Sequence, residues 1–458
     1  MGEGSLSTIH HIAPSFAASI ELSLCSSMKP LVEDDSGSRT RLSVRIKRRV
    51  HPELARLLRR VAWRIGLATR VFLEIFSLRV LTVAELNSSN SSVLHEHSSS
   101  VAVFPEFLEP QSGDFSASII GHHRVFSPRA FCLEGVDVAI NYKFACVIQD
   151  RSLLLLPRYT EKPWNLIEGL TSQIRGGILA QEGMRALVWA RRSSELQPQG
   201  LYIGHRAIYN WSHWLVDFLP ALHFANQIES IPADAPLIFP EDSLPTGAYM
   251  ESLGLFLRER PMVCVPIEAW TKFLKLYWVE PPVIGSPVTV GTRLGETTTV
   301  NVDLFRQYRS VYFEQFWESK DSHGQDNGPV VFVMRRSDKS RRYNQEDVYR
   351  VISDFGVKPV YAEDLSLEEK VRIFSGARAI VGENGSGMAN LLFASRGTKV
   401  LTWWGGSEGL INHTATISQV TGLEVHGLHP SAITKMPGGD YSVDLNSLRI
   451  ALGNVVGH

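Results

Sequence analysis

The alternation of apolar and polar positions is most regular in the last third of the chain. Short apolar runs, typical of buried strands, alternate there with segments whose apolar residues recur at helical spacing. The predicted strands cover 330–334, 357–362, 379–382 and 399–404, and the predicted helices cover 346–353, 367–377 and 385–394. This order predicts an α/β fold with a doubly wound parallel sheet, followed by a terminal helix near 443–455.

The middle of the chain repeats the alternation less cleanly. A hairpin is expected over 144–157, and a helix is expected to begin near Trp211. Further strands are predicted at 201–204, 236–239 and 262–265, with a helix at 249–258. The polar segment 318–329 ends in Asn-Gly-Pro and marks a domain boundary. We therefore divide the chain into residues 1–116, 117–328 and 329–458.

The first of these parts has an unusual charge distribution. Residues 41–80 hold eleven Lys and Arg against two acids, and their apolar residues recur at helical spacing. Such a basic amphipathic helix can lie on an anionic membrane surface, or it can pack on its own domain with a solvated basic face. Residues 84–116 are rich in serine without periodicity, which predicts a linker.

Composition narrows the class of protein. The chain is 44% apolar and 20% charged with a net charge of −1, so it can build large cores and is not expected to bind nucleic acid. No apolar run predicts a spanning helix, and the N-terminus lacks a signal-peptide pattern. Four scattered cysteines predict a reducing compartment without a zinc site. We expect a cytoplasmic protein that can contact the inner face of the membrane through 41–80.

The first candidate for chemistry is the sequence NWSHWLVDFLP, which begins at Asn210. His213 and Asp217 are four residues apart, so they share a face if the segment is helical. A histidine beside a carboxylate is a plausible general base, and Trp211 and Trp214 offer rings for a sugar. The alternative is a helix end in which the histidine caps a carbonyl and the tryptophans are core.

The second candidate follows the first strand of the doubly wound unit. Arg335 and Arg336 come at its carboxyl end, where such sheets bind ligands, and Arg342 and Asn344 follow in the loop. Arginine binds phosphate through paired hydrogen bonds. The alternative is a solvated basic loop in which Asn344 caps the next helix.

The third candidate is the glycine-rich sequence GENGSGMAN between a strand and a helix. Backbone N–H groups at such a turn can cradle phosphate, although neither the dinucleotide fingerprint nor a Walker sequence is present. The alternative is a turn required only for tight packing. Glu383 is expected to point toward a hydroxyl or a basic residue. The residues expected to bind a ligand are Gly382, Asn384, Gly385, Ser386, Gly387 and Asn390.

Together, these candidates suggest two α/β domains, one holding an anionic donor and one holding a base. That plan is typical of enzymes that use nucleotide sugars. In its three sequence boxes, which lie in order within about 120–430, the chain resembles glycosyltransferase family 61. Its first box reads N-x-x-H-W-x-x-D-x-L-P, and its second holds the arginines and Asn344. It departs from the family pattern at Asn384, where the family has histidine, and by one extra residue between Asn344 and Glu346.

The resemblance implies a GT-B-like architecture, with two Rossmann-like domains facing across a cleft behind a basic helical N-terminal extension. Residues 117–328 would then bind the acceptor and residues 329–458 the nucleotide sugar. It implies an inverting, metal-independent transfer, without a cofactor, from a donor such as a UDP-sugar to a glycan in polysaccharide or capsule biosynthesis.

The resemblance also implies roles for residues. Asp217 is the first choice for the base and His213 the second. Asn210, Trp211 and Trp214 would contact the acceptor, while the arginines, Asn344 and the glycine turn would bind the donor. The expected partners are donor and acceptor, with homo-oligomer formation left open. The alternative function is a non-catalytic, glycosyltransferase-like subunit of a polysaccharide assembly complex.

Overall fold

The computed structural model divides the chain into two compact units, Met1–Ile65 and Gly66–His458. The described residues all belong to the second unit. They are 78–82, 91–96, 101–107, 116–125, 128–142, 146–149, 152–155, 178–182, 185–188, 191–204, 208–241, 246–267, 269–280, 283–285, 298–316, 328–336, 342–403, 405, 414, 417–418 and 420–457. The basic stretch 41–80, apart from its last three residues, lies outside them.

The C-terminal part of the chain builds a sheet in the order β17-β16-β18-β19-β20-β4-β3. The first five strands in this order are parallel, and β4 and β3 add an antiparallel edge. The strands are β16 (Val330–Val333), β17 (Val357–Val360), β18 (Ala379–Glu383), β19 (Lys399–Trp403), β20 (Glu424–Leu428), β4 (Ser116–Val125) and β3 (Val101–Phe107). The predicted doubly wound sheet is thus confirmed, with its topological switch point between β16 and β18.

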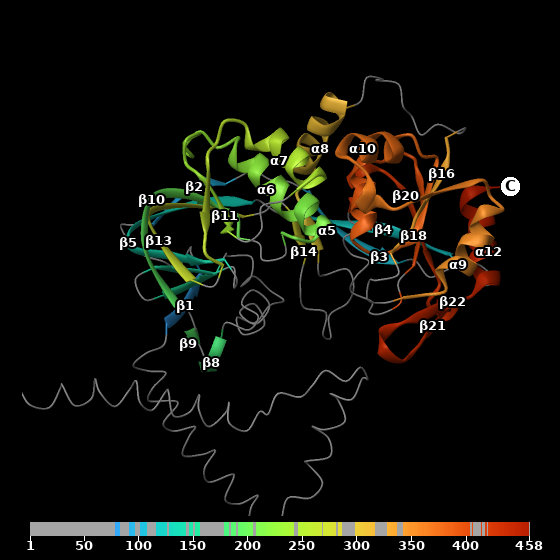
Figure 1. Cartoon of the computed structure of the whole chain (residues 1–458), viewed down its shortest axis with the longest axis horizontal. Helices are drawn as coiled ribbons and strands as arrows, with labels where there is room; N and C mark the ends of the chain where they lie inside the picture. Colours follow the sequence, from blue (N-terminus) through green and yellow to red (C-terminus); the bar gives the residue numbers. More distant parts are fainter. Residues whose placement is uncertain are drawn as a thin grey trace, which may run out of the picture. The chain divides into compact units, whose positions relative to one another are not determined.

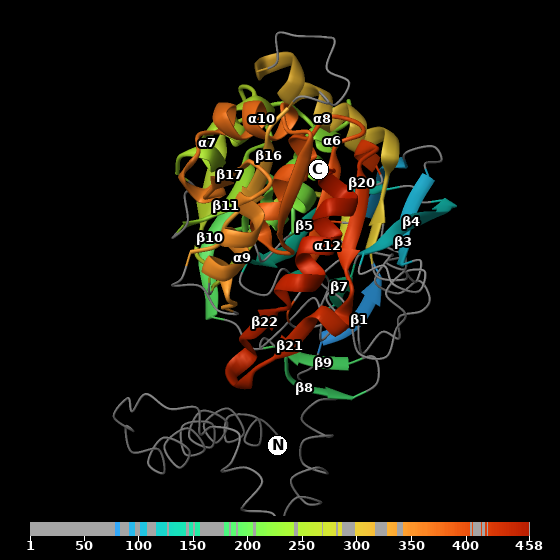
Figure 2. The same cartoon turned by 90° about the vertical axis from the view of Figure 1, so that its right-hand side faces the viewer.

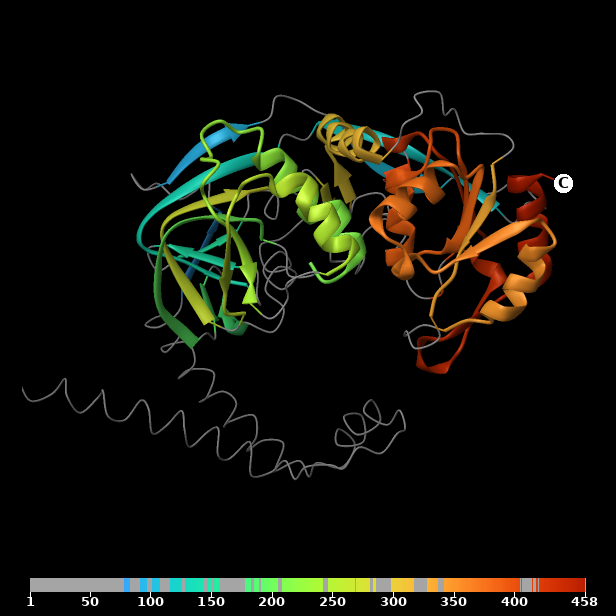
Figure 3. The same ribbon diagram turned by 45° about the horizontal axis from the view of Figure 1, so that its top comes forward.

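Helices cover both faces of this sheet (Figures 1 and 3). The helical elements are α9 (Gln345–Ser353), η6 (Ala362–Asp364), α10 (Leu367–Ser375), η7 (Ser386–Phe393), η9 (Pro430–Ala432), η10 (Pro437–Gly439) and α12 (Leu445–Val456). Alternate residues of β16 separate the two layers: Phe332 packs in the cluster with α9 and α12, and Val331 in the cluster with α10. A capping box between Ser366 and Glu369 starts α10.

The second large sheet is mixed. Its order is β12-β11-β10-β13-β5-β6-β7-β1-β9-β8, with β2 also pairing β5. The strands are β1 (Leu78–Thr82), β2 (Ser91–Glu96), β5 (Arg129–Asn141), β6 (Cys146–Gln149), β7 (Ser152–Leu155), β8 (Ile178–Glu182), β9 (Arg185–Val188), β10 (Arg191–Tyr202), β11 (Leu237–Pro240), β12 (Met262–Val265) and β13 (Ala269–Val279). Four of its strands, β12, β11, β10 and β13, form a continuous parallel set, and the second Rossmann-like domain stays an expectation.

The helices that follow β10 in the sequence and precede β16 are α5 (Trp211–His213), η3 (Trp214–Phe218), α6 (Leu219–Ala225), α7 (Ala248–Leu257) and α8 (Val302–Phe316). Two hairpins complete the described fold: β14 (Val283–Gly285) with β15 (Thr298–Val300), and β21 (Ile433–Lys435) with β22 (Tyr441–Val443). Figure 2 shows the latter hairpin below α12. The predicted hairpin within 144–157 is confirmed as β6–β7.

The serine-rich segment 84–116 is not a plain linker. It contains β2 and β3, and β4 begins at its end. β2 pairs β5 in the mixed sheet, while β4 pairs β20 in the C-terminal sheet. Backbone pairing with existing strands forms these elements despite the weak apolar pattern. The sheets therefore do not follow the predicted domain boundaries at 116/117 and 328/329. The strands β3 and β4, which precede residue 126, complete the C-terminal sheet.

Candidate active site

The first sequence box forms a continuous helical segment with an unusual turn. Asn210 caps its start, accepting a hydrogen bond from Ser212 N at 2.9 Å. In η3, the N–H of Leu219 donates to the carbonyl of Trp214, five residues back. Pro220 has no N–H to donate and stands at the start of α6. A proline at this position favours the wider turn, so the helical segment continues through Pro220 into α6.

This segment brings His213 and Asp217 into direct contact. His213 Nδ1 lies 2.6 Å from Asp217 Oδ2, and the exposed fractions of the two side chains are 32% and 3%. The carboxylate is thus buried behind the ring, while the imidazole reaches solvent. With the proton on Nδ1, the ring donates to Asp217 and Nε2 keeps a lone pair. The geometry favours His213 over Asp217, our first choice from the sequence, for contact with a substrate.

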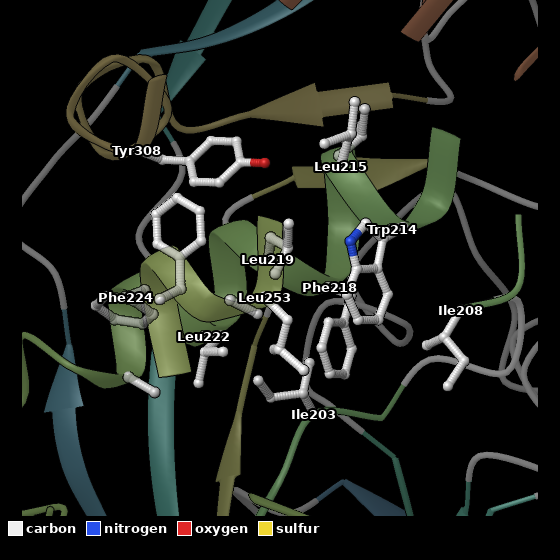
Figure 4. Close-up of a cluster of buried hydrophobic side chains, with 14 of the residues drawn as sticks. Ile203, Ile208, Trp214, Leu215, Phe218, Leu219, Leu222, Phe224, Leu253 and Tyr308 are labelled. Atoms are coloured by element: carbon white, nitrogen blue, oxygen red, sulfur yellow. The ribbon is translucent and has the colours of Figure 1, made fainter. Parts of the chain in front are cut away.

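Trp214 does not face a ligand. Its side chain is fully buried and lies in the apolar cluster with Phe218, with ring centroids 4.7 Å apart (Figure 4). Its indole N–H donates to Ser252 Oγ at 2.9 Å. The expectation that Trp214 contacts an acceptor is therefore wrong, because packing of the helix on the core turns this ring inward. Trp211 is also buried and donates to Asn390 Oδ1 at 2.9 Å.

The switch point of the C-terminal sheet carries an ion pair. Arg335 follows β16 and Glu383 ends β18, and Arg335 Nη1 lies 3.0 Å from Glu383 Oε2. Gln345 fixes the backbone of Arg335 by accepting from its N–H at 2.6 Å and donating to its carbonyl at 2.8 Å. The sequence expectation that Glu383 points to a basic residue is confirmed. Ligands of doubly wound sheets bind at this carboxyl edge.

The glycine turn lies directly beside this ion pair. A Cβ placed on Gly385 would be 3.4 Å from Arg335 Nη1, and one on Gly387 would be 2.9 Å from Val333 Cγ1. The absence of side chains therefore lets the turn approach both β16 and the arginine. The turn opens η7, a 3₁₀ helix rather than the predicted α-helix, with Ser386 exposed at its start. The first N–H groups of such a helix have no partner within it.

Three residues of the turn have structural partners instead of the expected ligand contacts. Asn384 is buried, accepts from Thr414 Oγ1 at 2.5 Å and donates its N–H to Trp403 O at 2.7 Å. Asn390 is fully buried between Trp211 and Gly387 O. Gly382 lies inside β18, where a Cβ would be 3.1 Å from Val333 Cβ. The expectation that these three bind a donor is corrected, because burial and these contacts occupy them.

The remaining arginine-box residues do not join the glycine turn in the described contacts. Arg336 pairs with Glu363 and Asp364. Arg342 is exposed and pairs with Asp440 at 3.2 Å. Asn344 accepts from the N–H of Val443 at 2.8 Å and donates to its carbonyl at 3.1 Å. Asn344 and Arg342 thus contact the β21–β22 hairpin, and their role in donor binding stays a prediction.

No local sequence pattern predicts the aromatic group around Glu383. Tyr343 and Tyr441 stack with centroids 5.4 Å apart, and Tyr343 meets Trp403 edge-on at 5.9 Å. Burial, and then the charge of Glu383, raise the pKa of both phenols above the usual range, so they stay neutral. These residues lie far apart in the sequence, and only the sheet order brings them together.

Lys370 was also missed, because a lysine on an amphipathic helix normally faces solvent. Here it is buried, donates to Leu365 O, and lies with Nζ 5.2 Å from the centroid of the Trp211 ring. Burial lowers its pKa from the usual value, while Glu251 and neighbouring acids oppose that effect. The amine therefore packs against the start of the helix that carries His213.

Within the residues that the structure describes, no group of three or more histidine, cysteine or acidic side chains is arranged to hold a metal ion. No helix in that same part is both long and apolar enough to cross a membrane.

Comparison with protein families gives one match. Residues 211–401 match the model of the family described as Glycosyltransferase 61. The match begins at the first residue of α5 and ends in β19, so it contains the His213–Asp217 pair, Arg335 and the glycine turn. A comparison with curated proteins found no match.

Proposed function

We propose that the chain, whose residues 211–401 match the model of glycosyltransferase family 61, is a glycosyltransferase of that family and an inverting enzyme that uses a nucleotide-sugar donor. The donor we propose is a UDP-sugar, and the acceptor is a hydroxyl of a glycan in polysaccharide or capsule synthesis. The observation that carries this proposal is a connection between two groups of residues. The His213–Asp217 pair lies on one helical segment, and Arg335 lies against the turn at Gly385. The Trp211–Asn390 hydrogen bond connects the elements that hold them.

The proposed chemistry is a single displacement. The acceptor oxygen attacks the anomeric carbon of the donor sugar from the side opposite the leaving group, and the bond from that carbon to the diphosphate oxygen breaks. His213 Nε2 takes the hydroxyl proton, while Asp217 holds the ring and stabilises the charge that it gains. One base and one displacement invert the anomeric configuration.

The leaving nucleoside diphosphate carries the negative charge that develops. Arg335 stands at the edge where it can meet this charge, and the N–H groups at the start of η7 add a second positive region. Glu383 is the partner of Arg335 in the described structure, so a diphosphate must compete with this carboxylate. We propose that arginine and the helix start do this work without a metal ion.

The domain plan that accompanies this chemistry is also a proposal. In a GT-B-like arrangement, the C-terminal doubly wound sheet binds the donor, and the region of β10–β13 with α5 and α6 presents the base and acceptor. The basic stretch 41–80 is proposed to contact the inner face of the membrane in the cytoplasm. Its charge of +9 supports this placement.

Calorimetry with the purified full chain tests the donor site directly. Uridine diphosphate should bind with the same affinity in buffer with EDTA and in buffer with Mg²⁺. Binding that disappears with EDTA contradicts the metal-free proposal. The absence of binding by uridine, guanosine and cytidine diphosphates contradicts the nucleotide-sugar donor.

A non-catalytic subunit of a polysaccharide assembly complex is the alternative that the sequence left open. The intact His213–Asp217 pair argues for catalysis, because a non-catalytic subunit has no requirement for a partly exposed imidazole oriented by a buried carboxylate. Donor binding without turnover of any nucleotide sugar would favour the alternative.

A further inference from the structure

Asn390 is fully buried where the glycine turn meets the helix of His213. It accepts from Trp211 Nε1 at 2.9 Å and donates to Gly387 O at 2.8 Å. We propose that Asn390 is a positioning residue that couples the donor turn to the base. The roles of the two ends rest on the function proposed above. The contact that carries the coupling joins Trp211 and Asn390, which are 179 positions apart in the sequence.

Trp211 is well suited to transmit a position because it is held on several sides. Tyr249 meets its ring edge-on, with centroids 4.9 Å apart at 71°, and Lys370 Nζ lies 5.2 Å from the ring centroid. Lys370 is itself held by the carbonyl of Leu365. Because Trp211 opens α5 and His213 ends it, a displacement of this ring moves the imidazole.

The other end of the link is equally constrained. Gly387 is packed so closely on Val333 that a Cβ would lie 2.9 Å from Cγ1. Its carbonyl accepts from Asn390, while the N–H of Met388 returns to the carbonyl of Gly385 at 2.9 Å. A change in the turn when a diphosphate binds is therefore passed to Asn390 and to the indole.

The amide has a property that apolar packing at this place would lack. A leucine of similar volume would fill the buried site, but it would not fix the direction between Trp211 and Gly387, because hydrogen bonds are directional and apolar contacts are not. Loss of a fixed direction costs rate through misplacement of the reacting groups. Asn390→Leu and Trp211→Phe separate the two effects by keeping most of the packing.

The first test needs no turnover. The full chain is labelled with 5-fluorotryptophan, and the ¹⁹F signal of Trp211 is assigned by its loss in Trp211→Phe. Saturating uridine diphosphate, verified by calorimetry, should shift this signal in the unsubstituted chain and leave it unshifted in Asn390→Leu. A signal that stays in place at saturation, or one that still shifts in Asn390→Leu, overturns the coupling while donor binding stands. Failure of every nucleoside diphosphate to bind overturns the proposed function and the coupling with it.

The second test is a double-mutant cycle in kcat. Each single variant should lose about ten- to a hundredfold in kcat with little change in the KM for donor, and the double variant should be no slower than the slower single. Asn226→Leu is the matched control. The Asn226 amide donates to Phe256 O at 2.6 Å, and neither residue belongs to the candidate site. The control should lower the Tm without lowering kcat. Losses that multiply in the double variant, or an equal loss of kcat in the control, would contradict the proposal.

Discussion

At the scale of single residues, the charged groups of the candidate site are already paired. His213 contacts Asp217, Arg335 contacts Glu383, and Arg336 contacts Glu363 and Asp364. Pairing fixes the direction of each side chain before substrate arrives. It also means that a donor gains only the difference between its own contact with Arg335 and the one that it replaces.

The first prediction concerns the proposed base. His213→Ala should lower kcat by about 10³-fold or more, because the proposed base is removed. Asp217→Asn should lower kcat by about 10²-fold, because the imidazole can still accept a proton but is no longer oriented by a carboxylate. Initial rates of nucleoside diphosphate release measure both, and calorimetry should show near-normal donor affinity. His429→Ala, which removes a histidine bonded to Ser431, is the control and should keep full activity. A larger loss in Asp217→Asn than in His213→Ala would return the role of base to Asp217.

The second prediction concerns Arg335. Arg335→Ala should weaken binding of a nucleoside diphosphate by about 1–3 kcal/mol, the usual value of a hydrogen bond to a charged group. It should also lower the Tm, since Glu383 stays buried without its counter-charge.

The double variant Arg335→Ala/Glu383→Gln separates these two consequences, because it should recover Tm but not affinity. Arg350→Ala is the matched control, since Arg350 is exposed and pairs with Asp347 on the same helix. Unchanged affinity in Arg335→Ala would show that the diphosphate does not meet this arginine.

At the scale of elements, local patterns predicted the parallel core well and the irregular elements poorly. The strands β16 to β19 and the helices α9 and α10 were predicted because each has a short apolar run or a helical stripe. β13 was missed because a register shift between Phe273 and Lys275 breaks the alternation of its buried positions. β2 and β3 were missed because their pairing partners, and not their composition, make them strands.

The candidate site shows the same division. The His213–Asp217 contact follows from spacing on one helical segment, so the sequence predicted it. The partners of Trp214, Asn344 and Asn390 are side chains or backbone groups on other elements, and no local pattern reports them. From the sequence we therefore expected these residues to contact ligands, whereas in the structure they contact other parts of the protein.

The third prediction concerns pH and the packing of α6. Burial lowers the pKa of His223 to about 4, and the ring meets Phe256 edge-on at 5.7 Å and Gln227 Nε2 at 3.0 Å. The unfolded chain takes up this proton near pH 6.5 and the folded chain only near pH 4, so the free energy of unfolding should fall as pH drops through that interval.

Thermal unfolding between pH 7 and pH 4.5 measures this effect. His223→Gln, which retains a neutral polar group, should lose less Tm over the interval than the unsubstituted chain. Parallel curves for the two proteins would show that His223 does not cause the acid sensitivity.

At the scale of the whole molecule, sheet topology unites sequence boxes that lie far apart. Arg335 and Glu383 meet because β16 and β18 are neighbouring parallel strands, and Trp211 reaches η7 through Asn390. The strands β3 and β4 come from residues 101–125 and complete the C-terminal sheet. Domain boundaries drawn along the sequence therefore do not describe how the sheets are built.

The fourth prediction concerns the first compact unit. Deleting residues 1–65, which ends at the boundary between the two units, should leave binding of uridine diphosphate unchanged and abolish sedimentation with anionic vesicles. The deletion removes most of the basic residues in 41–80. Vesicles of neutral lipid are the control. If the deletion prevents folding, or if sedimentation persists, the basic stretch is not the membrane contact.

In the proposed mechanism, His213 and Arg335 act together in the transfer of a sugar from a nucleotide. The most direct measurement follows a panel of nucleotide sugars by ¹H NMR with the full chain, in EDTA, with water or added glycan as acceptor. One donor should release its nucleoside diphosphate and give a product of inverted anomeric configuration, and His213→Ala should abolish this turnover while still binding the donor. A product of retained configuration, or equal turnover in His213→Ala, would contradict the account.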